Sequence, residues 1–133
     1  GHPVALQNIR VPLFVVATER DHVAPWRSVY KIHFLSDTRI TFLLANGGHN
    51  AGIVGDPDAP GRHYHVATRA AEGAYVSADE WRLAARREEG SWWPAWQAWL
   101  ARHGRTRRAR PPALGGASGR TLGDAPGRYV LER

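Results

Sequence analysis

Two apolar runs, joined by residues 19–38, most constrain the fold of this 133-residue chain. Residues 11–18 (VPLFVVAT) and 39–45 (RITFLLA) are almost continuously apolar and rich in β-branched side chains. Runs of this kind are typical of strands buried on both faces, as in parallel sheets. The connection is long enough for a parallel crossover. The sequence therefore predicts a strand, a helix and a second strand parallel to the first.

The connection between the two runs predicts a polar turn and then a helix. Pro25 suits the first position of a helix that continues to about Leu35, because its fixed φ is already helical and no N–H is needed there. Near-helical spacing gives this segment an apolar stripe of Trp26, Val29, Tyr30 and Phe34. We expect this helix to connect the two strands.

The middle of the chain is punctuated by glycine and proline, so residues 51–77 predict a loop region. Within it, residues 62–68 fit either a short strand or a packed irregular segment. Ser77 and Glu80 have the spacing of a capping box, which predicts a helix from about residue 78 to residue 89.

A tryptophan-rich segment follows. Ser91 is expected to cap a helix that runs through Arg102, with Pro94 tolerated in its first turn. Beyond Gly104 the chain is rich in Arg, Pro and Gly, and a short strand is expected at residues 129–131. Five side chains of the helical segment share one face, which is more typical of helix packing than of a substrate platform. They are Trp92, Trp96, Trp99, Leu100 and His103.

The formal net charge of +6 raises the question of a nucleic-acid partner. Lys31 is the only lysine among 18 basic residues, a bias that fits genome-wide base composition better than phosphate contacts. Much of the excess charge also lies within residues 102–110. We therefore expect no nucleic-acid partner.

The residue types that are missing also limit the chemistry. Without cysteine, this sequence can form no disulfide, thiolate metal site or cysteine nucleophile of its own. No apolar run approaches the roughly 20 residues that span a bilayer, so no membrane span is expected. Methionine is absent even at the start. We expect a soluble piece cut from a longer globular protein.

Two polar residues follow the two predicted strands. Asp21 stands just after the first strand and His49 just after the second. Because the carboxyl ends of adjacent parallel strands meet at one edge of a sheet, these side chains are expected to lie together. A carboxylate that accepts a hydrogen bond from one imidazole nitrogen leaves the other nitrogen free as a base. Gly47, Gly48 and Gly52 would allow a tight turn that presents the ring.

This layout is that of the acid and histidine of a nucleophile–acid–histidine triad, in the order used by α/β-hydrolases. The alternative is that Asp21 caps the following helix and His49 is an ordinary loop residue. No GxSxG box is present, so a nucleophile would lie upstream of Gly1. Neighbouring His22, Trp26 and Asn50 either line a pocket or simply pack. The remaining histidines match no metal-ligand motif, so we expect no metal site.

Five segments of the chain resemble the C-terminal region of the α/β-hydrolase-type catalytic domain of polyhydroxyalkanoate synthases. The Asp-His and Gly-His motifs alone would indicate only an α/β-hydrolase, and the Ser-Trp-Trp-Pro block makes the resemblance specific. The segments are residues 15–26 (VVATERDHVAPW), 47–53 (GGHNAGI), 90–96 (GSWWPAW) with Trp99 and Leu100, 111–115 (PPALG) and 124–130 (DAPGRYV).

The resemblance implies an α/β fold in which residues 1–103 hold the last parallel strands, their crossover helix and the Trp-rich helices of an incomplete catalytic domain. Residues 104–133 would be an irregular extension. It also implies a cytoplasmic acyltransferase that polymerises (R)-3-hydroxyacyl-CoA into storage polyester (poly-3-hydroxybutyrate in the simplest case). His49 would activate an upstream Cys nucleophile, while Asp21 would orient His49 or help to activate the substrate's 3-hydroxyl.

The resemblance further implies no metal or organic cofactor beyond the CoA of the substrate. The implied partners are the growing polyester chain, a second copy in a homodimer, the polymer granule surface and granule-associated proteins. Without a nucleophile, the chain alone is predicted to be inactive. The alternatives are another α/β-hydrolase (thioesterase, depolymerase or lipase) and a non-catalytic module that binds granules or nucleic acid.

Overall fold

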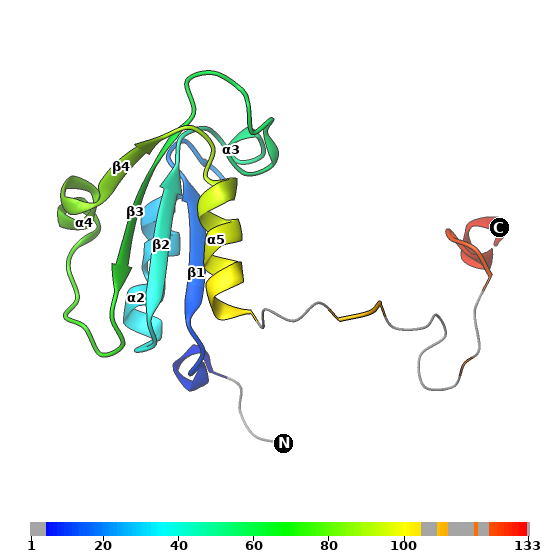
Figure 1. Cartoon of the computed structure of the whole chain (residues 1–133), viewed down its shortest axis with the longest axis horizontal. Helices are drawn as coiled ribbons and strands as arrows, with labels where there is room; N and C mark the ends of the chain where they lie inside the picture. The colour runs from blue at the N-terminus through cyan, green and yellow to red at the C-terminus, as the bar shows by residue number, and fades with distance from the viewer. Residues whose placement is uncertain (1–4, 105–108, 112–118, 120–122, 133) are drawn as a thin grey trace. The chain divides into compact units, whose positions relative to one another are not determined.

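The computed structural model describes residues 5–104, 109–111, 119 and 123–132. The chain divides into two units, Gly1–His103 and Gly104–Arg133. The first unit contains the sheet and its covering helices (Figure 1). In the second, the 3₁₀ helix η3 (Arg128–Leu131) occupies the place where a short strand was predicted, so that prediction was wrong.

Four strands form one mixed sheet in the order β1-β2-β3-β4. They are β1 (Leu13–Thr18), β2 (Ile40–Ala45), β3 (His63–Arg69) and β4 (Arg86–Glu89). The first two are parallel, in a register that pairs Leu13 with Ile40 and Thr18 with Ala45. The predicted parallel strand pair is thus confirmed. The remaining two pairings are antiparallel, and the chain has an α/β architecture.

The crossover from β1 to β2 contains two short helices in place of the single helix predicted. They are α1 (Trp26–Tyr30) and α2 (Ile32–Leu35). Lys31 separates them, and its N–H is shared between the carbonyls of Ser28 and Val29. Arg69 of β3 donates to the carbonyls of His33 (3.0 Å) and Ser36 (2.5 Å), so the end of α2 is held by the sheet.

The interruption at Lys31 also changes which side chains face inward. Phe34, predicted to belong to the apolar stripe, is 62% exposed and stacks on Tyr75. His33 is buried in its place. The stripe was therefore correct for Trp26 and Tyr30 but wrong for Phe34.

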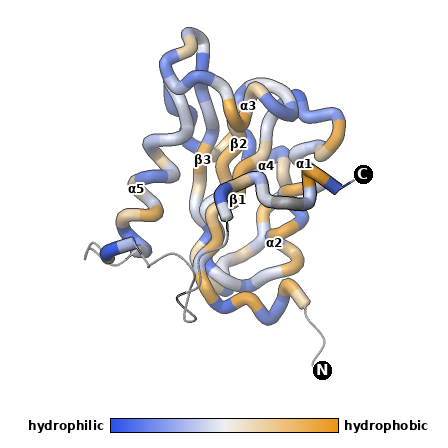
Figure 2. Tube along the Cα trace, turned by 90° about the vertical axis from the view of Figure 1, so that its right-hand side faces the viewer, coloured by the Kyte–Doolittle hydropathy of each residue, from blue (hydrophilic) through white to orange (hydrophobic). Residues whose placement is uncertain are grey.

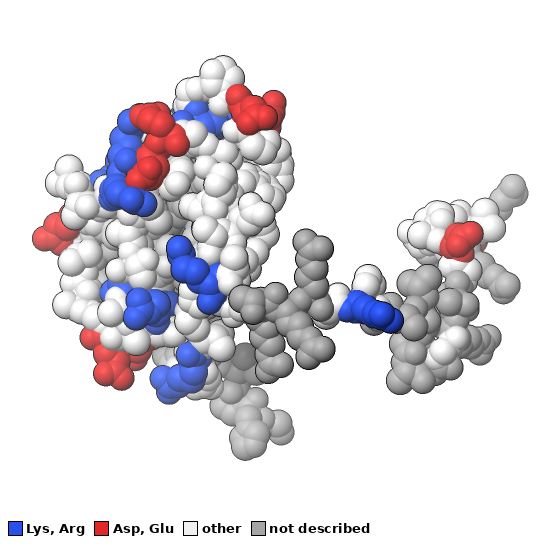
Figure 3. All heavy atoms as spheres, in the orientation of Figure 1, with Lys and Arg blue, Asp and Glu red and all other residues white. Residues whose placement is uncertain are grey.

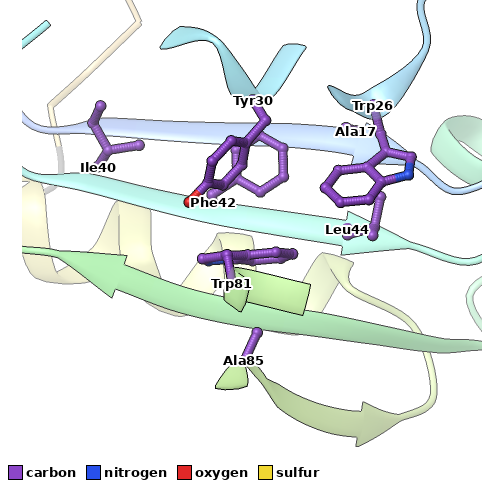
Figure 4. Close-up of a cluster of buried hydrophobic side chains, with 8 residues drawn as sticks. All are labelled: Ala17, Trp26, Tyr30, Ile40, Phe42, Leu44, Trp81 and Ala85. Carbon is purple, nitrogen blue, oxygen red and sulfur yellow. The ribbon is translucent and has the colours of Figure 1, made fainter. Parts of the chain in front are cut away.

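Side chains alternate across the sheet, so each face has its own core. Helices α1, α2 and α4 (Ala78–Ala84) cover one face, and α5 (Trp93–His103) covers the other (Figure 2). The face under α1 and α4 buries eight residues (Figure 4). These are Ala17, Trp26, Tyr30, Ile40, Phe42, Leu44, Trp81 and Ala85. On the opposite face, Leu43, Ala45, Tyr64 and Trp92 form a second cluster.

The helix predicted for residues 78–89 ends early. Its capping box is confirmed: Ser77 Oγ accepts from the Glu80 N–H, and the Glu80 carboxylate accepts from the Ser77 N–H. The chain turns extended at Ala85, and β4 pairs with β3. Pairing with an otherwise free strand edge outweighs the helical propensity of the Arg and Glu residues in this segment.

The other strand and helix predictions have mixed outcomes. Residues 62–68 form most of β3, which decides between the two options in favour of a strand. Within the loop region, α3 (Ala51–Val54) was not predicted, nor was the 3₁₀ helix η1 (Leu6–Asn8) before β1. The Trp-rich helix α5 is confirmed, and Ser91 Oγ accepts from the Trp93 N–H at its start (3.3 Å).

No helix within the described residues is long and apolar enough to cross a bilayer. Charges of both signs meet at β4, where Arg86 pairs with Glu88 (2.7 Å) and Arg87 with Glu89 (Figure 3). These pairs neutralise the charges of β4 locally.

Candidate active site

The loops that follow β1 and β2 leave the sheet side by side. Beyond the last paired residues of the parallel ladder, the Glu19 N–H donates to the Ala45 carbonyl and the Arg20 N–H to the Gly47 carbonyl, both at 2.9 Å. These bonds extend the ladder into the loops. Asp21 and His49 are therefore brought to the same edge of the sheet, as the sequence predicted.

The Asp21 carboxylate is held by the turn that precedes α1. Its Oδ1 accepts from the backbone N–H groups of Val23 (2.9 Å) and Ala24 (2.8 Å), and the side chain is only 10% exposed. The hydrogen bond from Ala24 and then that from His49 lower the pKa of Asp21 to about 2. Asp21 is thus ionised throughout the neutral range.

The imidazole of His49 contacts this carboxylate through one nitrogen. Its Nδ1 lies 2.9 Å from Asp21 Oδ2 and 3.1 Å from Oδ1. An ionised carboxylate can only accept, which assigns the proton to Nδ1 and leaves Nε2 unprotonated in the neutral ring. The side chain is 46% exposed, so the ring is partly open to solvent. The arrangement is that of a general base with its orienting carboxylate.

Glycines are required at two positions of the His49 loop. Gly47 has φ +114°, and a Cβ there would lie 2.9 Å from the Cα of Gly52. A Cβ at Gly52 would lie 2.4 Å from the Thr18 methyl group at the end of β1. The loop is packed directly onto the strand, so its path is fixed by close backbone contact.

The three residues proposed to line a pocket have different surroundings. Trp26 is buried in the core, where it packs against Tyr30 and Trp81. This packing accounts for its burial, and a part of Trp26 in a pocket stays a prediction. His22 and Asn50 are exposed, and Asn50 precedes α3 without a side-chain capping bond. Their part in a pocket stays a prediction.

Among the described residues, no group of three or more potential ligands could hold a metal ion. His63 and His65 lie on one face of β3 with ring centroids 6.3 Å apart. His65 is buried against Arg82 of α4, whose guanidinium also donates to Glu19 (2.6 Å).

Sequence reasoning missed two sets of contacts around the site. Arg82 connects α4 to Glu19, two residues before Asp21, and no spacing in the sequence signals this pair. The indoles of Trp92 and Trp93 donate to the carbonyls of Gly52 and Ile53, just after His49. The adjacent Trp-Trp pair was visible, but its target lies 40 residues earlier in the chain.

No family model matches the chain. Comparison with curated proteins, however, finds relatives that are named poly(3-hydroxyalkanoate) polymerases. Poly(3-hydroxyalkanoate) polymerase subunit PhaC of Cupriavidus necator is 37% identical over 130 residues, which cover 98% of this chain and 21% of that protein. The subunit PhaC of Rhizobium etli is 38% identical over 135 residues, or 100% of this chain and 20% of the relative. The chain corresponds to a region of the poly(3-hydroxyalkanoate) polymerases.

This correspondence confirms the resemblance seen in the sequence. Poly(3-hydroxyalkanoate) polymerase 2 of Ectopseudomonas oleovorans adds 37% identity over 135 residues, covering 100% of this chain and 23% of that polymerase. The chain spans about a fifth of the length of the curated polymerases it matches.

Proposed function

We propose that Asp21 and His49 form the acid–base part of the active site of a poly(3-hydroxyalkanoate) polymerase. The observation that carries the proposal is the hydrogen bond between His49 Nδ1 and Asp21 Oδ2 (2.9 Å), at the carboxyl ends of two parallel strands. Relatives named as polymerases support the reaction class. The substrates would be (R)-3-hydroxyacyl-CoA and the growing polyester chain.

The proposed fold is the C-terminal part of an α/β-hydrolase domain, formed by residues 1–103, with residues 104–133 as an extension. The acid follows one parallel strand and the histidine the next, in the order expected for that fold. In the described residues β1 is the edge strand of the sheet, and Leu13–Val16 are only half-buried. A further parallel strand of the polymerase would pair with this edge and bring the nucleophile toward His49.

The proposed chemistry uses a thiol from another segment of the polymerase, because this sequence contains no cysteine. His49 Nε2 accepts the thiol proton, and the thiolate attacks the carbonyl carbon of the acyl-CoA thioester. The bond to the CoA sulfur breaks, and CoA leaves as a thiol with the proton that His49 returns. The ionised Asp21 stabilises the imidazolium that forms in between.

Chain extension then uses the same base. His49 accepts the proton of a 3-hydroxyl group, whose oxygen attacks the acyl thioester and releases the enzyme thiol. The new bond is an ester, and no metal or organic cofactor takes part in the proposed steps. The polymerase would work as a homodimer in the cytoplasm. It would lie at the surface of polymer granules, together with granule-associated proteins.

The test is His49→Ala in the polymerase that contains this chain, with release of CoA from 3-hydroxybutyryl-CoA as the measurement. Loss of nearly all turnover is expected, whereas His103→Ala, at the distant end of α5, should retain it. The 133-residue chain alone should release no CoA above background. Near-normal turnover of the His49→Ala enzyme would refute the proposal.

A further inference from the structure

The backbone that carries His49 continues into a very short helix. α3 has four residues, Ala51–Val54, and the preceding Asn50 provides no side-chain cap. The Gly52 N–H donates to the Gly48 carbonyl (3.0 Å), so His49 lies inside a closed turn. A single turn of helix is not stable without tertiary contacts. Something outside α3 must therefore fix this turn.

Two indole groups, at and just before the start of α5, hold this turn by hydrogen bonds. Trp92 Nε1 donates to the Gly52 carbonyl (3.0 Å), and Trp93 Nε1 donates to the Ile53 carbonyl (3.1 Å). Carbonyls at the end of a helix have no partner within the helix, so these donors satisfy groups that would otherwise be unpaired. The two rings also stack on each other, with centroids 5.1 Å apart and planes at 28°.

The same turn is packed tightly on its other side. Gly52 lies against the Thr18 methyl group at the end of β1, and Gly47 lies against Gly52. Trp92 is only 9% exposed, and its hydrogen bond to Gly52 is itself buried. Loss of the Trp92 N–H would therefore leave the Gly52 carbonyl with little access to solvent as a replacement partner.

We propose that Trp92 and Trp93 are positioning residues for His49, acting through their hydrogen bonds to the first turn after it. The inference rests on the proposed function of His49 as the base. Removing the donor from Trp92 leaves a buried carbonyl unpaired and allows the turn to move. The imidazole then spends less time aligned with Asp21, and the rate of the proton transfers falls.

Trp96 provides a matched control within the same aromatic cluster. It packs against the rings of Trp92 (6.1 Å) and Trp93 (5.5 Å), and it belongs to the same hydrophobic core. None of the hydrogen bonds found in the described residues uses its indole N–H. A change to phenylalanine there removes similar ring area without removing a bond to α3.

The experiment compares Trp92→Phe, Trp93→Phe and Trp96→Phe in the polymerase that contains this chain. Trp92→Phe is expected to lower kcat about tenfold with KM unchanged, since one buried hydrogen bond is lost. Trp93→Phe, whose ring is less buried, should lower kcat about threefold. Trp96→Phe should stay within about twofold of the parent. Equal kcat values for Trp92→Phe and Trp96→Phe would overturn the inference.

A measurement that does not depend on turnover separates this inference from the proposed function. In the polymerase labelled with ¹⁵N-histidine, the low-field Nδ1 proton of His49 is assigned by its loss in His49→Ala. Trp92→Phe should broaden or shift this signal while Trp96→Phe preserves it. An unchanged signal in Trp92→Phe contradicts positioning. Full activity of His49→Ala would instead refute the proposed function, and the proton signal would still decide on the positioning.

Discussion

His49 and His33 lie in the same unit but in opposite surroundings. His49 is 46% exposed at the sheet edge, with an ionised carboxylate at its Nδ1. His33 is 5% exposed on α2, between Tyr30 (centroids 4.4 Å apart) and Phe42 (5.8 Å). Neither of its ring nitrogens has a hydrogen-bond partner among the described residues. Burial, and then the charge of Arg69, lower the pKa of His33 to about 4.

The comparison shows that the surroundings, and not the residue type, decide what a histidine can do. His33 is kept neutral and acts as a flat ring in an aromatic core, because charging it would require desolvation without a partner. His49 instead presents its Nδ1 to the ionised carboxylate of Asp21, and the proposed proton transfer rests on this contact. One histidine is therefore suited to proton transfer and the other to packing.

The largest effect should come from removing the charge that distinguishes the two histidines. Asp21→Asn retains an oxygen for the N–H groups of Val23 and Ala24, so the turn should survive. Its amide, however, presents a donor to Nδ1 and favours the wrong tautomer of His49. We expect turnover of the polymerase to fall about 10³-fold, with less effect on KM.

Asp56→Asn, in the exposed loop after α3, is the control for loss of a carboxylate and should have normal turnover. Steady-state release of CoA measures both variants. Turnover of Asp21→Asn within tenfold of the parent would show that the carboxylate does not orient His49.

Because the pKa of Asp21 is about 2, its ionisation should not produce an acid limb in the pH profile of turnover above about pH 4.

A smaller effect concerns the pH dependence of folding. Unfolded His33 has a pKa near 6.5, and the folded protein binds the same proton only near pH 4. The unfolded state therefore binds more protons in this window, so the free energy of unfolding falls as the pH decreases. Lowering the pH from 7 to 5 should reduce the free energy of unfolding by about 2 kcal/mol through His33 alone. Urea unfolding at the two pH values measures this change.

His33→Phe tests whether that slope belongs to His33. The phenyl ring fits between the same aromatic neighbours and cannot be protonated, so stability at pH 7 should change by less than about 1 kcal/mol. Most of the loss between pH 7 and pH 5 should disappear, and a remainder is expected from His65, whose pKa burial also lowers. Phe34→Leu, on the exposed side of α2, should keep the slope. A full slope in His33→Phe would assign it to other groups.

The smallest effect should come from the N-cap of α4, a helix on the same face of the sheet as His33. Ser77→Ala removes the bond from the Glu80 N–H (3.2 Å) and should lower the free energy of unfolding by about 1 kcal/mol. Ser28→Ala on α1 should have almost no effect. Turnover should change by less than about twofold, since the cap's hydrogen bonds join only Ser77 and Glu80 and do not reach Asp21 or His49. A loss of turnover greater than about twofold would show that the cap of α4 is coupled to the site at Asp21, for example through the bond from Arg82 to Glu19.

Local signals in the sequence were sufficient for the elements that depend on short-range rules. The continuous apolar runs predicted β1 and β2, and the Ser77–Glu80 spacing predicted the capping box. The juxtaposition of Asp21 and His49 followed from one topological rule, that adjacent parallel strands end at the same edge. Their catalytic role stays a proposal.

The errors occurred where a distant segment overrode local preference. Residues 86–89 look helical by themselves, but β3 provides a strand edge with which they pair. The crossover helix breaks at Lys31, and Arg69 of β3 donates to the carbonyls of His33 and Ser36 near the end of α2. In this arrangement His33 faces inward and Phe34 outward. Neither outcome is encoded in the spacing of neighbouring residues.

Residue patterns alone were enough to predict the parallel strand pair, the family resemblance and the position of Asp21 and His49 at the ends of those strands. Contacts between distant segments leave His49 exposed and paired, while His33 is buried and neutral. Such contacts also place two indoles on the turn after His49. The physical reason is that hydrogen bonding and desolvation depend on which groups meet in space. These groups come from segments as far apart as residues 52 and 92.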